Sequence, residues 1–225
     1  MAERLRVVVA RLLREGRASL EDLASEIKAS PELVASMLEG FPVKIESGSV
    51  LVESKANLLL EAWKRGFDPV ELALKAGWKD FEQLCAEVFE RCGYRALLNV
   101  RVKFRGRSFE LDVVAMRRPW VLAVDCKRWC RLRSSHLKSA ASMQRERCGA
   151  LASALSSAQN LRAEVGGWSV AKVVPLVVNL YEGVVKVHDG VAIVPLNKLV
   201  TFLNEFESYI DDLLVLPVKL AEKLV

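Results

Sequence analysis

Residues 111–129 read "LDVVAMRRPWVLAVDCKRW", two short apolar runs separated by a polar connection at 117–119. Runs of this length, rich in Val and divided by a Pro-containing turn, predict two neighbouring β-strands. Three charges interrupt the runs, Asp112 in the first and Asp125 and Lys127 in the second. A buried charge costs free energy unless it is paired. The same stretch therefore predicts the two strands and a functional site formed by the three charged residues.

Alternate side chains of a β-strand share a face, so Asp125 and Lys127 point to one side of the second strand and Cys126 to the other. Asp112, on the first strand, can approach Asp125 across the sheet. Two carboxylates brought together repel each other unless a cation joins them. A divalent ion such as Mg²⁺ supplies that charge and leaves Lys127 to orient or deprotonate a water, or to neutralise charge developing on phosphorus. The alternative is an interstrand salt-bridge cluster in an inert sheet.

The surrounding sequence predicts an α/β domain built on these strands. A helix with an apolar stripe precedes them and ends at Gly93, a residue typical of the position after a helix. A long apolar helix and a continuous apolar strand follow them. In chain order, we expect a helix at 81–91, a meander of strands at 96–104, 108–116 and 120–127, a helix at 135–158, a strand at 170–180, a hairpin turning at 189–190 and a helix at 196–209.

The first 54 residues have a different pattern, three short helices followed by a hairpin around Ser47 and Gly48, and this order resembles a winged helix-turn-helix. They hold seven Lys and Arg against nine Asp and Glu, and the third helix, "PELVASMLEG", has two acids and no base. A DNA-reading helix needs donors for phosphates and base edges, so we expect residues 1–54 to contact a protein partner. The expected segments are a winged-helix-like domain at 1–54, a helical linker at 55–78, the α/β domain at 79–209 and a C-terminal tail at 210–225.

Positive charge is concentrated in one part of the chain. The net charge is +5, but residues 101–147 hold thirteen Lys and Arg against four Asp and Glu, which leaves the rest of the chain at −4. A local excess of this size indicates a polyanionic partner, of which nucleic acid is the commonest. The alternative is an ordinary solvated charged face.

Composition narrows the class of protein further. A hydrophobic content of 52% over 225 residues is enough for a buried core. No apolar run reaches the length of a membrane span, and the N-terminal residues alternate charged and apolar side chains, unlike a signal peptide. Five cysteines, an odd number without a CxxC pair, indicate reduced thiols. We therefore expect a cytoplasmic protein that does not bind membranes.

The charged strands resemble the PD-(D/E)xK nuclease superfamily, especially archaeal Holliday junction resolvases and Mrr-type restriction endonucleases. In that pattern an Asp opens the site and Glu/Asp-x-Lys follows one strand later, which matches Asp112 and then Asp125 and Lys127 in "VDCKRW". These subgroups also carry a Glu on the preceding helix in an "FE…GY" frame, and "FEQLCAEVFERCGY" places Glu82 there. The chain departs from the subgroups in having Asp125 where a Glu is usual.

The resemblance implies a restriction endonuclease-like α/β core of helix, three-strand meander, helix and strand. It implies a Mg²⁺- or Mn²⁺-dependent endonuclease that hydrolyses DNA phosphodiester bonds in repair, recombination or restriction. In this reading Asp112 and Asp125 hold the metal, Glu82 assists through metal or water, and Lys127 activates the nucleophile. A catalytically inactive DNA-binding or regulatory protein on the same fold is the alternative.

The resemblance and the distribution of charge predict further residues that face the site or contact DNA. Related nucleases often keep a Gln on the helix after the second strand, so Gln144 is expected to face the site. Trp129 could stack on a base, although packing is the commoner role of such a residue. The apolar C-terminal segment suggests a homodimer, since duplex cleavage generally needs one active centre per strand. The residues expected to contact DNA phosphates are Arg128, Arg131, Arg133, Lys138, Arg145 and Arg147.

Overall fold

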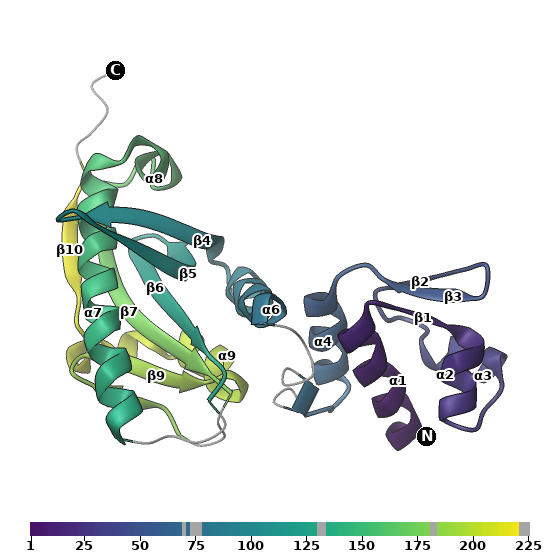
Figure 1. Cartoon of the computed structure of the whole chain (residues 1–225). Coiled ribbons are helices and arrows are strands. Elements are labelled where there is room, and N and C mark those ends of the chain that lie inside the picture. The colour runs from purple at the N-terminus through teal and green to yellow at the C-terminus, as the bar shows by residue number, and fades with distance from the viewer. Residues whose placement is uncertain (69–70, 73–77, 130–133, 181–183, 221–225) are drawn as a thin grey trace. The chain divides into compact units, whose positions relative to one another are not determined.

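The structure is a computed structural model that describes residues 1–68, 71–72, 78–129, 134–180 and 184–220 (Figure 1). The chain divides into two compact units, Met1–Leu84 and Cys85–Val225, and the division falls inside helix α6 (Trp78–Arg91). None of the helices in the described ranges combines the length and the apolar character that crossing a bilayer requires.

The first unit contains the three predicted helices and the predicted hairpin. Ser19 and Ser30 cap α2 and α3, since their hydroxyls accept from the backbone N–H groups of Glu21 (3.2 Å) and Leu33 (3.3 Å). A short strand that the sequence analysis did not predict, β1, makes a three-stranded sheet of order β1-β3-β2. The elements are α1 (Ala2–Glu15), β1 (Arg17–Ser19), α2 (Leu20–Glu26), α3 (Pro31–Met37), β2 (Val43–Glu46), β3 (Ser49–Val52) and α4 (Lys55–Lys64). The winged-helix resemblance remains one of element order.

The second unit is an α/β domain built on a seven-stranded sheet of order β4-β5-β6-β7-β9-β8, with β10 paired to β7. Its strands are β4 (Arg95–Phe104), β5 (Arg107–Arg117), β6 (Trp120–Lys127), β7 (Val170–Asn179), β8 (Lys186–His188), β9 (Val191–Pro195) and β10 (Leu216–Lys219). Its other elements are α7 (Ser134–Ser157), α8 (Gln159–Glu164), η1 (Leu196–Lys198), α9 (Leu199–Asn204) and η2 (Phe206–Asp212).

The strand connections are those that the sequence predicts. β4, β5 and β6 form an antiparallel meander, and β7 returns parallel to β6 after the α7 crossover. The β4–β5 turn has Arg105 and Gly106 at φ values of 48° and 76°, the left-handed pair that two-residue hairpins need. This meander, helix and strand make up a restriction endonuclease-like α/β fold.

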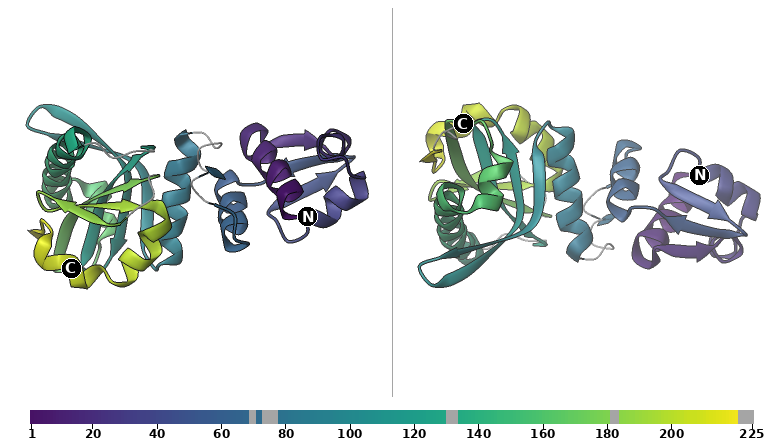
Figure 2. Two further views of the ribbon diagram at one scale, coloured as in Figure 1. Left: turned by 90° about the horizontal axis from the view of Figure 1, so that it is seen from below. Right: turned by 90° about the horizontal axis from the view of Figure 1, so that it is seen from above.

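Helices cover both faces of the sheet. α7 lies along one face (Figures 1 and 2), where Leu151 and Leu155 pack with Ala123 of β6 and Val173 of β7. On the opposite face of β6, the buried Cys126 thiol is hydrogen-bonded to Cys85 of α6, a contact that, together with burial, raises its pKa well above the usual value. The alternation within β6 therefore puts Asp125 and Lys127 on one face and Cys126 on the other, as the sequence predicts, and the structure shows that α7 covers the face of Asp125 and Lys127.

The end of the chain differs from the prediction. The expected helix at 196–209 is divided into η1, α9 and η2, and residues 216–219 of the expected C-terminal tail form strand β10. β9 pairs with β7 only at Leu176–Asn179, so the first half of β7 needs another neighbour. β10 pairs with that half, at Val170–Val173, and buries Val218 against α7 and the sheet. The apolar segment that suggested a homodimer is thus partly used within its own unit.

Candidate active site

The candidate site lies where strands β5 and β6 stop pairing. We call this place, with Asp112 on β5 and Asp125 and Lys127 on β6, the fork. Their ladder runs from the Arg117–Trp120 pair to the Val113–Val124 pair, and the next residue on each strand is Asp112 or Asp125. The Asp112 carboxylate fills the opening, since its Oδ2 accepts from the backbone N–H of Cys126 at 2.7 Å. The sequence prediction that these two carboxylates approach each other across the sheet is therefore consistent with the register.

Asp125 is a buried carboxylate with two cations on one oxygen. The residue is 2% exposed, and its Oδ1 accepts from Lys127 Nζ at 2.9 Å. The same Oδ1 accepts from the guanidinium of Arg147, which comes from α7. The Lys127 and Arg147 side chains keep 28% and 19% of their surface exposed, so both ends of the ion-pair cluster reach towards solvent.

Gln144 connects α7 to the site strand. It is fully buried, and its Nε2 donates to the carbonyl oxygen of Ala123 at 2.6 Å. Its Oε1 lies 3.5 Å from an amino nitrogen of Arg147, one helical turn further along α7. Gln144 thus fixes α7 against β6 next to Arg147, and its role at the site stays a prediction.

The two carboxylates influence each other electrostatically. Burial is the main reason that the pKa of Asp112 is raised, although the Cys126 N–H bond opposes this effect. The Asp125 charge raises the pKa of Asp112 further, while Lys127 and Arg147 lower it. The fork is therefore a partly desolvated cluster of two acids and two bases.

This donor set fits a divalent cation that retains water ligands. Within the described ranges, no three His, Cys, Asp or Glu side chains cluster in a way that could enclose a metal ion. Mg²⁺, however, is usually bound through one or two carboxylates, several waters and the substrate phosphates. The Asp112–Asp125 pair satisfies that requirement.

The other predicted site residues differ in their surroundings. Glu82 is buried on α6 but belongs to the first unit, so its participation remains a prediction. Lys138 and Arg145 are exposed on α7, Arg128 is half-buried, and Arg131 and Arg133 lie outside the described residues. Trp129 packs against a small apolar cluster of α7 and the sheet, with its ring 5.7 Å from that of His136.

Arg147 was predicted as a phosphate contact, whereas the structure pairs it with Asp125. The helical spacing of Gln144 and Arg147 is the signal that could have indicated this, since residues three apart lie on the same helix face. The pairing itself depends on the side of the sheet that α7 covers.

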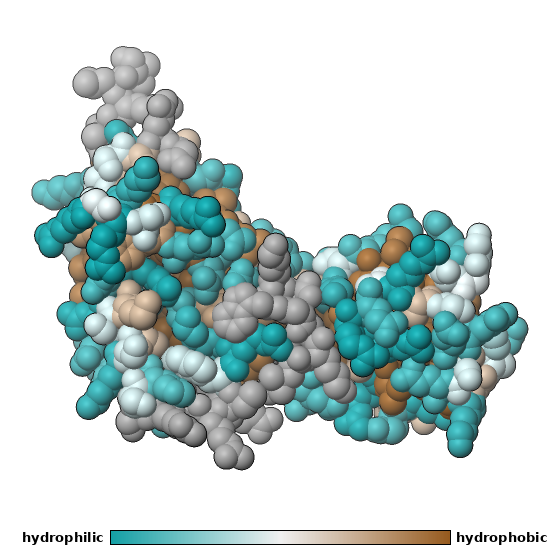
Figure 3. All heavy atoms as spheres, in the orientation of Figure 1, coloured by the Kyte–Doolittle hydropathy of each residue, from teal (hydrophilic) through white to brown (hydrophobic). Residues whose placement is uncertain are grey.

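A group of cations projects from the β4–β5 hairpin. Arg101, Lys103, Arg105 and Arg107, here called the basic arm, are all exposed, and hydrophilic side chains gather over this hairpin in Figure 3. Arg101 and Arg107 form ion pairs at 3.1 Å with Glu110 and with Glu146 of α7. Among the described residues, Lys103 and Arg105 have no carboxylate partner. The basic arm therefore presents uncompensated positive charge beside α7.

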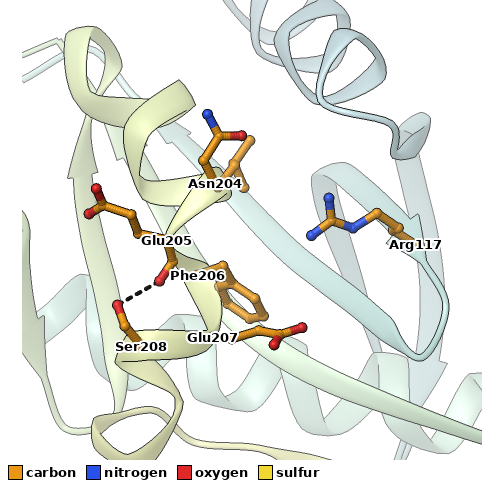
Figure 4. A pocket seen from close by; sticks show the side chains of 7 residues that line it. Arg117, Asn204, Glu205, Phe206, Glu207 and Ser208 are labelled. Atoms are coloured by element: carbon orange, nitrogen blue, oxygen red, sulfur yellow. Dashed lines mark hydrogen bonds between the residues drawn. The ribbon is translucent and has the colours of Figure 1, made fainter.

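A separate hollow of about 260 Å³ lies at the far end of β5, where Arg117 faces residues 203–208 (Figure 4). Arg117 and Glu207 point towards one another across it. The Arg117 guanidinium also donates to the Cys92 carbonyl at 3.3 Å and lies 4.4 Å from the centre of the Tyr94 ring. Arg117 is at the opposite end of the β5–β6 ladder from Asp112, so this hollow forms no part of the fork.

Comparison with known proteins finds a family match over the segment that contains the fork. Residues 73–165 match the Mrr_cat family model, described as restriction endonuclease, and this range includes both carboxylates, Lys127, Gln144 and Arg147. An uncharacterized protein of Archaeoglobus fulgidus is 29% identical over 137 residues, which are 60% of this chain and 95% of that protein.

Among solved structures, protein VC1899 from Vibrio cholerae aligns with 94% of this chain at 13% identity and a TM-score of 0.38. The alignment spans 56% of that protein, so this chain covers little more than half of its length. Residues 73–165 thus match an Mrr-type restriction endonuclease domain of the PD-(D/E)xK superfamily, and the fork lies within the matched segment.

Proposed function

We propose that the chain is a Mg²⁺- or Mn²⁺-dependent DNA endonuclease that hydrolyses phosphodiester bonds at the β5–β6 fork. The observation that carries the proposal is the convergence of Asp112 and the buried Asp125 beside Lys127. Two acids and an adjacent ammonium are the groups that metal-assisted phosphoryl hydrolysis needs. Its role would lie in DNA repair, recombination or restriction.

Each residue of the fork has a distinct part in this proposal. Asp112 and Asp125 would hold the ion, which when bound activates a water and neutralises charge on the phosphate. Lys127 would orient the attacking water or neutralise charge developing on phosphorus, since its Nζ stays beside the metal-binding carboxylate. Glu82 would assist through the metal or through a water.

A direct assay separates the endonuclease from an inactive DNA-binding or regulatory protein. Purified protein would be incubated with labelled duplex, single-stranded and four-way-junction DNA, with and without Mg²⁺. Metal-dependent nicking of any of these substrates is expected. Binding to DNA without nicking under every metal condition would favour the inactive protein, and the substrate that is cut best would narrow the biological role.

We expect the nuclease domain to supply most of the DNA affinity. The excess of positive charge lies in residues 101–147, whereas residues 1–54 are slightly acidic. A truncated protein that starts near Ala56 should therefore bind duplex DNA nearly as tightly as the full chain in a gel-shift assay. Loss of binding by the truncated protein, with a shift produced by residues 1–54 alone, would contradict this prediction.

The basic arm should bind DNA phosphates. Replacing both Lys103 and Arg105 with alanine removes the two cations of the arm that have no carboxylate partner among the described residues. The logarithm of the affinity for duplex DNA falls with the logarithm of the salt concentration, with a slope of about 0.9 for each phosphate that the protein neutralises. The slope of the double variant should therefore be shallower than that of wild type by about 1.8. Binding would be measured without metal, so that cleavage does not interfere.

Lys186 and Lys198 provide the matched control for this measurement. Both are exposed on the same unit but lie outside the basic arm. Their double alanine variant should keep the wild-type slope. Equal slopes for the two double variants would mean that the basic arm does not bind DNA.

A homodimer remains a separate prediction for a nuclease that cuts both strands of a duplex. Light scattering at micromolar concentration, with and without DNA, would test it. A monomer under both conditions would contradict it.

A further inference from the structure

One of the two cations that contact the Asp125 carboxylate, Arg147, comes from a different element of the fold. Lys127 reaches Asp125 Oδ1 from two residues along β6, whereas Arg147 reaches the same atom from α7. A divalent ion that binds Asp125 through Oδ1 would have to share that atom with the two cations, and an ion at the other carboxylate oxygen would be repelled by them. Arg147, Lys127 and a metal ion are therefore competitors for one buried carboxylate.

Neighbouring contacts hold the Arg147 guanidinium at this position. Gln144 is anchored to the Ala123 carbonyl at 2.6 Å, and its Oε1 lies 3.5 Å from Arg147. Arg147 has most of its side chain buried, and Asp125 is 2% exposed. Leaving a buried carboxylate without adequate positive charge is strongly unfavourable, so in metal-free protein Arg147 compensates Asp125.

Of the two cations, Arg147 is the one that can leave. Lys127 lies two residues from Asp125 on the same strand, so its side chain leaves the same face of the sheet. The Arg147 side chain comes from α7, so turning it towards solvent would leave Lys127, on the strand of Asp125 itself, as the remaining partner. A released guanidinium matches the geometry of a phosphate group, with which it can form two parallel hydrogen bonds.

We propose that Arg147 is the resident counter-cation of Asp125 in the metal-free protein, and that a divalent cation displaces it from Asp125 Oδ1. This inference rests on the proposed function, because it assigns the metal to the Asp112–Asp125 pair. Arg147 is then a positioning residue that limits how tightly metal is held. It also becomes available to a DNA phosphate only after the metal has bound.

Replacing Arg147 with glutamine tests the competition without requiring cleavage. Glutamine removes the charge and keeps a polar side chain that can still contact Gln144. Because the ion no longer has to displace a cation, Mn²⁺ should bind the Arg147→Gln variant about tenfold more tightly than wild type, within the usual range of coupling between sites. Isothermal titration calorimetry in the absence of DNA measures this directly.

The same variant should show a second effect, on thermal stability. Without metal its melting temperature should fall, because Asp125 loses one of its two partners. Saturating Mn²⁺ should restore most of the difference, since the ion supplies the missing charge. A variant that remains unfolded even in saturating Mn²⁺ would contradict the inference, because Arg147 would then be needed for more than its charge at Asp125.

Arg145 provides a matched control. It lies two residues earlier on α7, and its guanidinium donates to the Asp189 carbonyl at 3.1 Å instead of to a carboxylate of the fork. Arg145→Gln removes the same charge from the same helix and should change the Mn²⁺ affinity much less. An equal increase in Mn²⁺ affinity in Arg147→Gln and Arg145→Gln would indicate a general electrostatic effect. It would overturn direct competition at Asp125.

The remaining outcomes separate this inference from the proposed function. If wild type binds Mn²⁺ and nicks DNA but Arg147→Gln binds Mn²⁺ with equal or lower affinity, Arg147 stays on Asp125 and only the inference fails. If neither protein binds Mn²⁺, the inference and the metal-dependent function fail together. Binding by Arg147→Gln alone would show that Arg147 blocks the site and that the ion does not displace it, which would overturn the displacement.

Discussion

The Asp112→Asn variant should lose metal-dependent cleavage while it keeps its fold and its affinity for DNA. Asparagine retains a side-chain oxygen that can accept from the Cys126 N–H, a bond of 2.7 Å in the wild type. It lacks the negative charge that a divalent ion requires. Loss of several kcal/mol of metal-derived transition-state stabilisation corresponds to a rate decrease of about a thousandfold or more.

DNA affinity gives the internal control for this variant. Without metal, Asp112 and Asp125 repel the phosphate at the fork, so Asp112→Asn should bind DNA as tightly as wild type or slightly more tightly. The Asp112→Ala variant loses both the charge and the acceptor for Cys126, and its melting temperature should fall below that of Asp112→Asn. A folded Asp112→Asn protein that nicks DNA at the wild-type rate would refute the assignment of Asp112 to catalysis.

The Lys127→Ala variant should also lose cleavage, but with weaker DNA binding. Removing Nζ takes away the group proposed to act on the water or the phosphate, so nicking should decrease by a factor of about a thousand. One favourable phosphate interaction is removed as well, which should cost about 1 kcal/mol of affinity. The two fork variants are thus expected to differ in DNA affinity, with Lys127→Ala the weaker binder.

Stability distinguishes this result from an inert salt-bridge cluster. Asp125 keeps Arg147 as a partner in Lys127→Ala, so the melting temperature should fall only modestly. If the cluster were purely structural, neither fork variant would have a selective effect on DNA chemistry, and any loss of activity would follow the loss of stability. Lys138→Ala, which removes an exposed cation of α7, should affect neither stability nor the rate of nicking at saturating DNA. A folded Lys127→Ala protein with wild-type nicking would remove Lys127 from the mechanism.

Local sequence determined the strands of the fork and the direction of their side chains. The alternation in "VLAVDCK" places Asp125 and Lys127 on one face and Cys126 on the other, because side chains of a strand repeat every two residues. The turns at 105–106 and 189–190 likewise follow from an Arg-Gly and an Asp-Gly pair in the left-handed region. These features depend only on neighbours along the chain, so they could be predicted without a structure.

Tertiary packing decided which charges meet. Arg147 lies 22 residues from Asp125, and their pairing depends on the face of the sheet that α7 covers and on the rotation of α7 set by Gln144. Strand β10 forms for a similar reason, since the first half of β7 has no pairing with β9. A run of sequence such as "LPVK" cannot indicate where an unpaired strand edge lies. The sequence by itself determined the acids, the lysine and the strands that carry them; only the folded chain decided the counter-cation at Asp125 and the last strand of the sheet, because both depend on contacts between segments far apart in the sequence.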